Sequence, residues 1–171
     1  MSQLNSAIRA GDVAKVRQLI TNSHANLKET FGTIALAQAA DLGHLEIIQV
    51  LIEVGAEVND EDRVLYPHEI PLARAASQGH LQVVQVLLDA GAEVNIPVQD
   101  PEYWTPLMCA VNNGNIKVVK LLVDAGANVD EIRGGGNFAL MIAAHSKNWE
   151  IFEFLAPLTN SILRQEAEKV F

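Results

Sequence analysis

The stretch GHLQVVQVLLDAGAEVN, residues 79–95, decides the fold, because the chain carries two further copies of it. GHLEIIQVLIEVGAEVN occupies residues 43–59, and GNIKVVKLLVDAGANVD occupies residues 114–130. The copies start 36 and then 35 residues apart. A period of this length is typical of stacked supersecondary units, so we expect a repeat protein rather than one globular core.

Each copy predicts a helix that is packed between neighbouring helices. In the central copy, Gln82, Gln85 and Asp89 interrupt the apolar residues at spacings of three and four and form one polar stripe. The same places are polar in the other two copies: Glu46, Gln49 and Glu53, then Lys117, Lys120 and Asp124. The rest of the helix surface is apolar, which indicates that other helices pack against it on more than one side. A glycine follows the last apolar turn of each copy, where helices commonly end on a left-handed residue.

A shorter, alanine-rich helix is predicted before each copy, most clearly over residues 71–78 and 106–113. These segments read PLARAASQ and PLMCAVNN. Proline suits the first helical position, because its missing N–H would have no partner there, and the small residues allow two helices to approach closely. The repeating unit is therefore helix, turn, helix and loop.

These residues resemble the ankyrin repeat, whose pattern runs Thr-Pro-Leu-His, two alanines, Gly-His and a leucine-rich helix ending Gly-Ala-Asp-Val-Asn. Thr105, Pro106 and Leu107 match the first three places, and Met108 stands where the family has histidine. The resemblance covers about residues 4–157. It implies an all-α ankyrin-repeat solenoid of stacked helix-turn-helix units with extended hairpin-like loops, about five units including caps.

One domain is expected over residues 1–171, divided by the repeat period. The N-terminal cap takes residues 1–32, because Lys15 and Gln18 are polar at places where later copies are apolar, as a terminal repeat requires. The parts that follow are repeats at 33–69, 70–103 and 104–136, and a final repeat with a C-terminal capping helix at 137–171.

The tail, residues 161–171, is expected to cover the last repeat. Ser161 is suited to cap a helix, and Leu163, Val170 and Phe171 recur at helical spacing, so they are expected to pack near Phe152 and Phe154. The alternative is a free helix that binds a partner.

Composition and charge disfavour several classes of function. The net charge of −9 disfavours nucleic-acid binding. The sequence has no long apolar run, which disfavours a membrane span or a signal peptide for export. We therefore expect a cytoplasmic protein. A single cysteine, Cys109, allows no intramolecular disulfide. The histidines show no metal-ligand spacing, so no metal or cofactor is expected, and His44 and His80 are predicted to cap their helices.

Two neighbouring loops are longer than the third. Fifteen residues separate Ala56 from Leu72 and fourteen separate Ala92 from Leu107, against twelve between Ala127 and Leu140. In the family such loops are hairpin fingers. Segments 59–69, 95–103 and 128–136 together hold eight acidic residues and two basic ones, which form either an acidic binding rim or solvated turns.

The resemblance implies that a protein partner binds the finger tips and the outward positions of the short helices, and the acids indicate a partner with a basic surface. The expected finger residues are Asp60, Glu61, Asp62, Arg63, Tyr66, His68, Asp100, Glu102, Tyr103 and Trp104. Tyr103 and Trp104 have the alternative of packing under a finger. The expected groove residues are Gln38, Asp41, Leu42, Arg74, Ser77, Gln78, Cys109, Asn112, Asn113, Ile142 and His145.

The function expected on these grounds is a non-catalytic, monomeric protein–protein interaction module: an adaptor, scaffold or inhibitor. No serine, histidine and acid arrangement stands out for catalysis. The alternative is a small enzyme or ligand-binding module on a solenoid scaffold. A compact group of perturbed ionisable residues in a cleft would favour that alternative.

Overall fold

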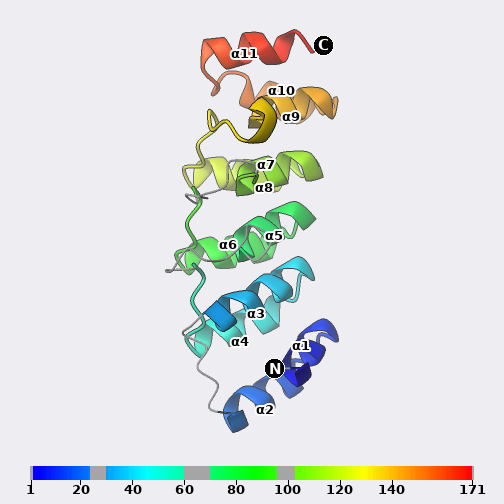
Figure 1. Cartoon of the computed structure of the whole chain (residues 1–171), viewed down its shortest axis with the longest axis vertical. Coiled ribbons are helices and arrows are strands. Elements are labelled where there is room, and N and C mark those ends of the chain that lie inside the picture. Colours follow the sequence, from blue (N-terminus) through cyan, green and yellow to red (C-terminus); the bar gives the residue numbers. More distant parts are fainter. Residues whose placement is uncertain (1, 24–29, 60–69, 96–102, 171) are drawn as a thin grey trace. The chain divides into compact units, whose positions relative to one another are not determined.

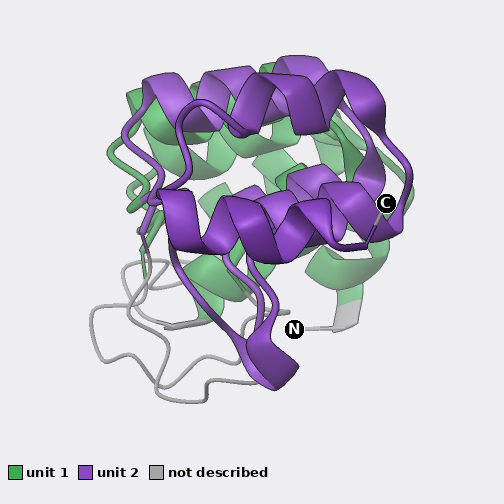
Figure 2. Ribbon diagram, turned by 90° about the horizontal axis from the view of Figure 1, so that it is seen from above, with its two compact units in different colours: residues 1–93 green, residues 94–171 purple. Residues whose placement is uncertain are grey.

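The computed structural model describes residues 2–23, 30–59, 70–95 and 103–170. These residues form eleven α-helices. The chain divides into two compact units, residues 1–93 and residues 94–171, which Figure 2 colours separately. The predicted all-α repeat architecture is confirmed within each unit.

Unit 1 contains three successive helix pairs in two layers (Figure 1). The first helices α1, α3 and α5 lie side by side, and so do the second helices α2, α4 and α6. The pairs are α1 (Ser2–Arg9) with α2 (Val13–Ser23), α3 (Thr30–Asp41) with α4 (Leu45–Glu53), and α5 (Pro71–Gln78) with α6 (Leu81–Asp89).

Unit 2 continues the same pattern and ends on an additional helix. Helix α9 packs against α7, α10 and α11, and α8 packs against α10. The elements are α7 (Pro106–Asn113), α8 (Ile116–Asp124), the 3₁₀ turn η2 (Gly134–Gly136), α9 (Ala139–His145), α10 (Trp149–Leu155) and α11 (Ser161–Glu168).

The long apolar faces of the second helices form the core of each unit. Ile47, Ile48 and Leu51 on α4 are fully buried, as are Val118 and Leu122 on α8. The polar stripe predicted for each of these helices is exposed at all of its places. Lys15 and Gln18 on α2 are exposed as well, and Nζ of Lys15 donates a 3.1 Å hydrogen bond to Oε1 of Gln18.

The short first helices begin where proline stands. Helices α5 and α7 start at Pro71 and Pro106, as predicted, and the Thr105 side chain accepts a hydrogen bond from the Met108 N–H. The expected boundary at residues 32 and 33 stays a prediction, and α3 begins at Thr30. That repeat has Ala35 in place of proline, so nothing disfavours helical geometry in the residues before it.

Histidine rings join successive repeats of unit 1. A Cβ atom added to Gly43 would lie 2.8 Å from Cε1 of His80, and one added to Gly11 would lie 3.0 Å from Cε1 of His44. Neither imidazole makes the predicted capping hydrogen bond to its own helix. Nε2 of His80 instead lies 3.1 Å from the Asp41 carbonyl oxygen of the preceding repeat. Each ring therefore occupies the space that a side chain at the glycine would need.

The asparagines that end the first two copies of the repeated stretch, Asn59 and Asn95, reach the backbone of the next repeat. In unit 1, Nδ2 of Asn59 donates to the Gly91 carbonyl at 2.9 Å, and its Oδ1 accepts from the Glu93 N–H at 2.8 Å. In unit 2, Asn95 makes the same two bonds, to the Gly126 carbonyl and from the Asn128 N–H, each at 2.8 Å. These side chains set the spacing of neighbouring loops.

The tail forms the expected helix, which lies against α9. Helix α11 packs on α9, and Ala167 is fully buried, whereas Val170 is 40% exposed. The expected contact with Phe152 and Phe154 on α10 stays a prediction. The N-cap is Asn160 rather than Ser161, since its side chain accepts hydrogen bonds from the first turn.

Candidate functional site

Asp41, the last residue of α3, is the centre of a polar network in unit 1. Its Oδ1 lies 3.4 Å from Nη1 of Arg74 and accepts a 3.0 Å hydrogen bond from Nε2 of Gln78, both on α5. The side chains of Arg74 and Asp41 are 35% and 34% exposed, so solvent limits the ion pair to about 0–1 kcal/mol. The pair therefore orients these side chains more than it stabilises the fold.

A groove of about 430 Å³ lies beside this network, formed by first helices of unit 1. Four of the expected groove residues line it: Gln38, Asp41, Leu42 and Arg74. The remaining lining residues are Asn5, Arg9, Ile34 and Ala37. Ser77 lies outside this lining, and its hydroxyl donates to the Arg74 carbonyl at 2.8 Å.

The sequence analysis missed the contribution of α1 to this groove. Arg9 stands two residues before Gly11, as Asp41 stands two residues before Gly43. The register that places Lys15 and Gln18 on the cap therefore also places Arg9 at an outward position. The expectation of a cap concerns the outer side of this repeat and predicts nothing about its groove side.

In unit 2 the corresponding positions of α7 and α9 are mixed in exposure. Asn112, Asn113 and His145 are exposed, and Cys109 is half-buried. Ile142 is only 4% exposed, which contradicts its expected place on a binding surface. Helix α9 packs between α7 and α11, and burial of a large aliphatic side chain is favourable by about 1.5–3 kcal/mol. Ile142 is therefore a core residue.

Most of the expected finger residues lie outside the described residues. These are Asp60, Glu61, Asp62, Arg63, Tyr66, His68, Asp100 and Glu102. Tyr103 and Trp104 are described, and both are half-buried just before the start of α7. Each therefore presents part of its ring to solvent and part to the protein.

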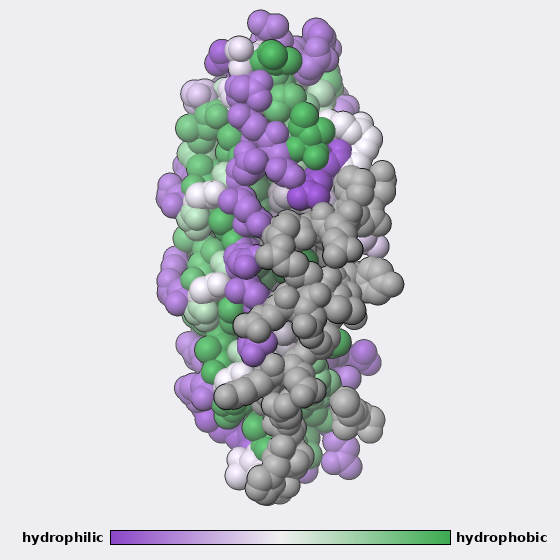
Figure 3. All heavy atoms as spheres, turned by 60° about the vertical axis from the view of Figure 1, so that its left-hand side comes forward, coloured by the Kyte–Doolittle hydropathy of each residue, from purple (hydrophilic) through white to green (hydrophobic). Residues whose placement is uncertain are grey.

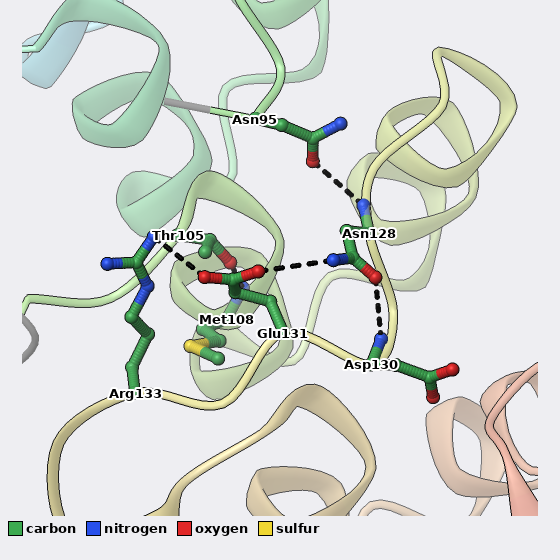
Figure 4. Close-up of polar contacts among 7 residues, drawn as sticks. All are labelled: Asn95, Thr105, Met108, Asn128, Asp130, Glu131 and Arg133. Atoms are coloured by element: carbon green, nitrogen blue, oxygen red, sulfur yellow. Dashed lines mark hydrogen bonds and ion pairs between the residues drawn. The ribbon is translucent and has the colours of Figure 1, made fainter. Parts of the chain in front are cut away.

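The acidic residues of the last loop have internal partners in unit 2 (Figure 4). Oε1 of Glu131 lies 2.8 Å from Nη2 of Arg133, and Oε2 accepts a 3.1 Å hydrogen bond from Nδ2 of Asn128. Oδ1 of Asp130 accepts from the Asn160 N–H at 2.9 Å. For these two acids the structure favours a role in loop geometry over a role in a binding rim.

Apolar side chains are exposed mainly as isolated positions. In unit 2 they include Trp149 and Ile162, at 53% and 72% exposure. Figure 3 presents a side on which hydrophobic and hydrophilic residues are interspersed over the described surface. Scattered apolar residues are normal on protein surfaces, so they do not define a site by themselves.

Within the described ranges, His, Cys, Asp and Glu side chains form no group of three or more that could hold a metal ion. None of the helices described is long and apolar enough to cross a bilayer.

The family model described as "Ankyrin repeats (3 copies)" matches residues 4–98 and, in an overlapping placement, residues 72–165. The two matches together include all helix pairs and reach into α11. No curated protein matches the chain.

Proposed function

The chain belongs to the ankyrin-repeat family, and we propose that it is a non-catalytic module that binds a protein partner, as an adaptor, scaffold or inhibitor. Ankyrin repeats generally mediate protein–protein interaction. The observation that carries the proposal is the groove of about 430 Å³ on the first helices of unit 1, lined by polar and apolar side chains together. Such mixed linings are typical of recognition sites.

The proposed binding surface of unit 1 consists of this groove and the finger loop at residues 59–69. The acids at residues 60–62 attract a basic surface of the partner, and Tyr66 supplies an aromatic anchor. In unit 2, taken by itself, Tyr103 and Trp104 are the proposed anchors, and the exposed groove positions on α7 and α9 are further proposed binding positions. The bulk of the affinity is expected from the aromatic anchors, and the charges mainly accelerate association.

We further propose a monomeric, cytoplasmic protein. The polar side chains of Lys15 and Gln18, which are exposed on the first repeat, support a capped end rather than a self-association face. The single cysteine is compatible with a reducing compartment. Sedimentation velocity at micromolar concentration tests the monomer, and a stable dimer would contradict it.

Capture of partners from the native host, followed by kinetic measurement on each captured protein, tests the binding function. Replacing the acids at residues 60–62 with their amides is expected to slow association and reduce its salt dependence, because exposed charges act over about 8 Å at physiological ionic strength. Replacing Tyr66 or Tyr103 with alanine is expected to accelerate dissociation.

The matched controls lie on the second helices. Glu46, Gln49, Gln82 and Gln85 are exposed on the polar stripe of α4 and α6. Substitution of these residues is expected to leave binding unchanged. If these variants lose the partner while the finger variants keep it, the binding face is the opposite one and the proposed surface is wrong.

A further inference from the structure

The groove of unit 1 is lined by hydrogen-bond donors that have no partner among the described residues. Asn5, Arg9 and Gln38 line it. In the described part of unit 1, no hydrogen bond or ion pair engages their side chains. A guanidinium group carries five N–H donors and no acceptor, and each amide adds two donors. The groove therefore suits a ligand group that mainly accepts hydrogen bonds.

The one carboxylate among the described lining residues is already compensated. Asp41 is held by Nη1 of Arg74 at 3.4 Å and by the amide of Gln78 at 3.0 Å. The charged residues in the described lining are Arg9, Asp41 and Arg74, which together carry an excess of one positive charge. The whole chain, by contrast, has a net charge of −9. The groove is thus locally cationic on an acidic protein.

An apolar wall lies beside these donors. Ile34, Ala37 and Leu42 line the same groove, and Leu42 is 42% exposed. A ligand that covers Leu42 removes this apolar surface from water, which favours binding. The preferred ligand therefore combines a carboxylate with an adjacent aliphatic side chain.

We propose that this groove binds an acidic, amphipathic peptide segment of the partner protein, in which an Asp or Glu side chain contacts Arg9 and a neighbouring aliphatic residue packs on Leu42. The inference rests on the proposed function and specifies the chemistry that one part of the surface recognises. Asn5 and Gln38 donate to the peptide backbone carbonyls. Arg74 remains paired with Asp41 and adds to the local positive potential.

The groove has the size of an anchor site rather than of a complete interface. Its volume of about 430 Å³ lies within the usual range for ligand sites, about 300–1,000 Å³. A standard protein interface buries about 800 Å² on each partner, so further contacts are needed for tight binding. A short peptide alone is therefore expected to bind weakly.

Titration of the full ¹⁵N-labelled chain with the acetylated and amidated peptide GSELELESG tests the proposal. Amide signals of Arg9, Gln38 and Leu42 are expected to shift at millimolar peptide. The charge-reversed peptide GSKLKLKSG is expected to leave those signals unmoved. Because the protein is acidic overall, general electrostatic attraction would give the opposite order, so a preference for the glutamate peptide identifies the groove.

Two variants and their matched controls assign the contacts. Arg9→Gln is expected to weaken binding of GSELELESG about fivefold, the effect of losing one partly solvated charge-assisted contact. Arg17→Gln removes an arginine that pairs with Glu53 outside the groove, at 57% exposure, and should change nothing. Leu42→Ala should weaken binding, whereas Val54→Ala, at a similarly exposed position, should not.

Several results would overturn the proposal. These are equal shifts with both peptides, no shift of the groove signals at millimolar peptide, or equal effects of Arg9→Gln and Arg17→Gln. A concentration-dependent dimer that Arg9→Gln dissociates would identify a second copy of this chain as the occupant instead. If finger variants abolish capture of the protein partner and Arg9→Gln does not, the proposed function stands and the groove inference fails.

Discussion

Gly43→Ala is expected to destabilise unit 1 through a contact between repeats. Gly43 has a φ of +72°, and an alanine Cβ would lie 2.8 Å from Cε1 and 2.9 Å from both ring nitrogens of His80. The left-handed conformation costs a non-glycine residue about 1–2 kcal/mol. Displacement of the ring adds about 1–3 kcal/mol, the usual cost of overpacking. The expected loss in the free energy of unfolding is about 2–5 kcal/mol.

Gly91→Ala is the matched control, because it has the same backbone conformation without the contact. Its φ is +88°, and nothing lies within 4 Å of the added Cβ. Only the backbone cost of about 1–2 kcal/mol is expected there. Urea unfolding followed by circular dichroism gives both values from the midpoint and slope. Equal losses for the two variants would refute the ring contact as a determinant of stability.

A double-mutant cycle isolates the same interaction. His80→Ala removes the ring and its contact with the Asp41 carbonyl, at 3.1 Å, for an expected loss of about 1 kcal/mol. In the His80→Ala background, Gly43→Ala is expected to cost only the backbone term. Additive losses would mean that the ring moves aside without cost.

Three further predictions concern unit 2. Asn95→Ala removes two inter-repeat hydrogen bonds of 2.8 Å, so it should lower the free energy of unfolding by about 1–3 kcal/mol. Urea titration measures this loss, and an unchanged midpoint would contradict the prediction. Lys147 has a φ of +54° where the other repeats have glycine. Lys147→Gly should therefore raise the free energy of unfolding by about 0.5–1 kcal/mol in the same titration, whereas Lys147→Ala should leave it unchanged. Deletion of residues 161–171 uncovers α9, against which Ala167 is buried, and should lower the thermal midpoint or cause aggregation; an unaltered midpoint would mean that the tail does not cap.

The helices and their order could be predicted because the signals for them are local. The polar stripe, the glycine after each long helix and the proline before each short one act within a few residues of the backbone that they control. The same locality explains why the start of α3 could not be predicted. That repeat has Ala35 at the place of proline, so the sequence carries no mark of the helix start at Thr30.

The binding surface could be predicted only in part. The outward positions of α3 and α5 were identified from the repeat register, and Gln38, Asp41, Leu42 and Arg74 do line one groove. Ile142 occupies the same register as Gln38 and Arg74 but is buried on α9, which packs against α7, α10 and α11. A register position shows which way a side chain points, whereas its exposure depends on what covers it.

The sequence by itself determined the repeat, the order of its helices and the polar stripe that each second helix exposes, because these depend on backbone preferences and on the helical period. Tertiary structure decided which side chains meet across repeats. The imidazole of His80 occupies the space that a side chain at Gly43 would need instead of capping its own helix, and the donors of Arg9 come beside the compensated carboxylate of Asp41. Such contacts join residues more than thirty positions apart, and their distances follow from how the helices stack.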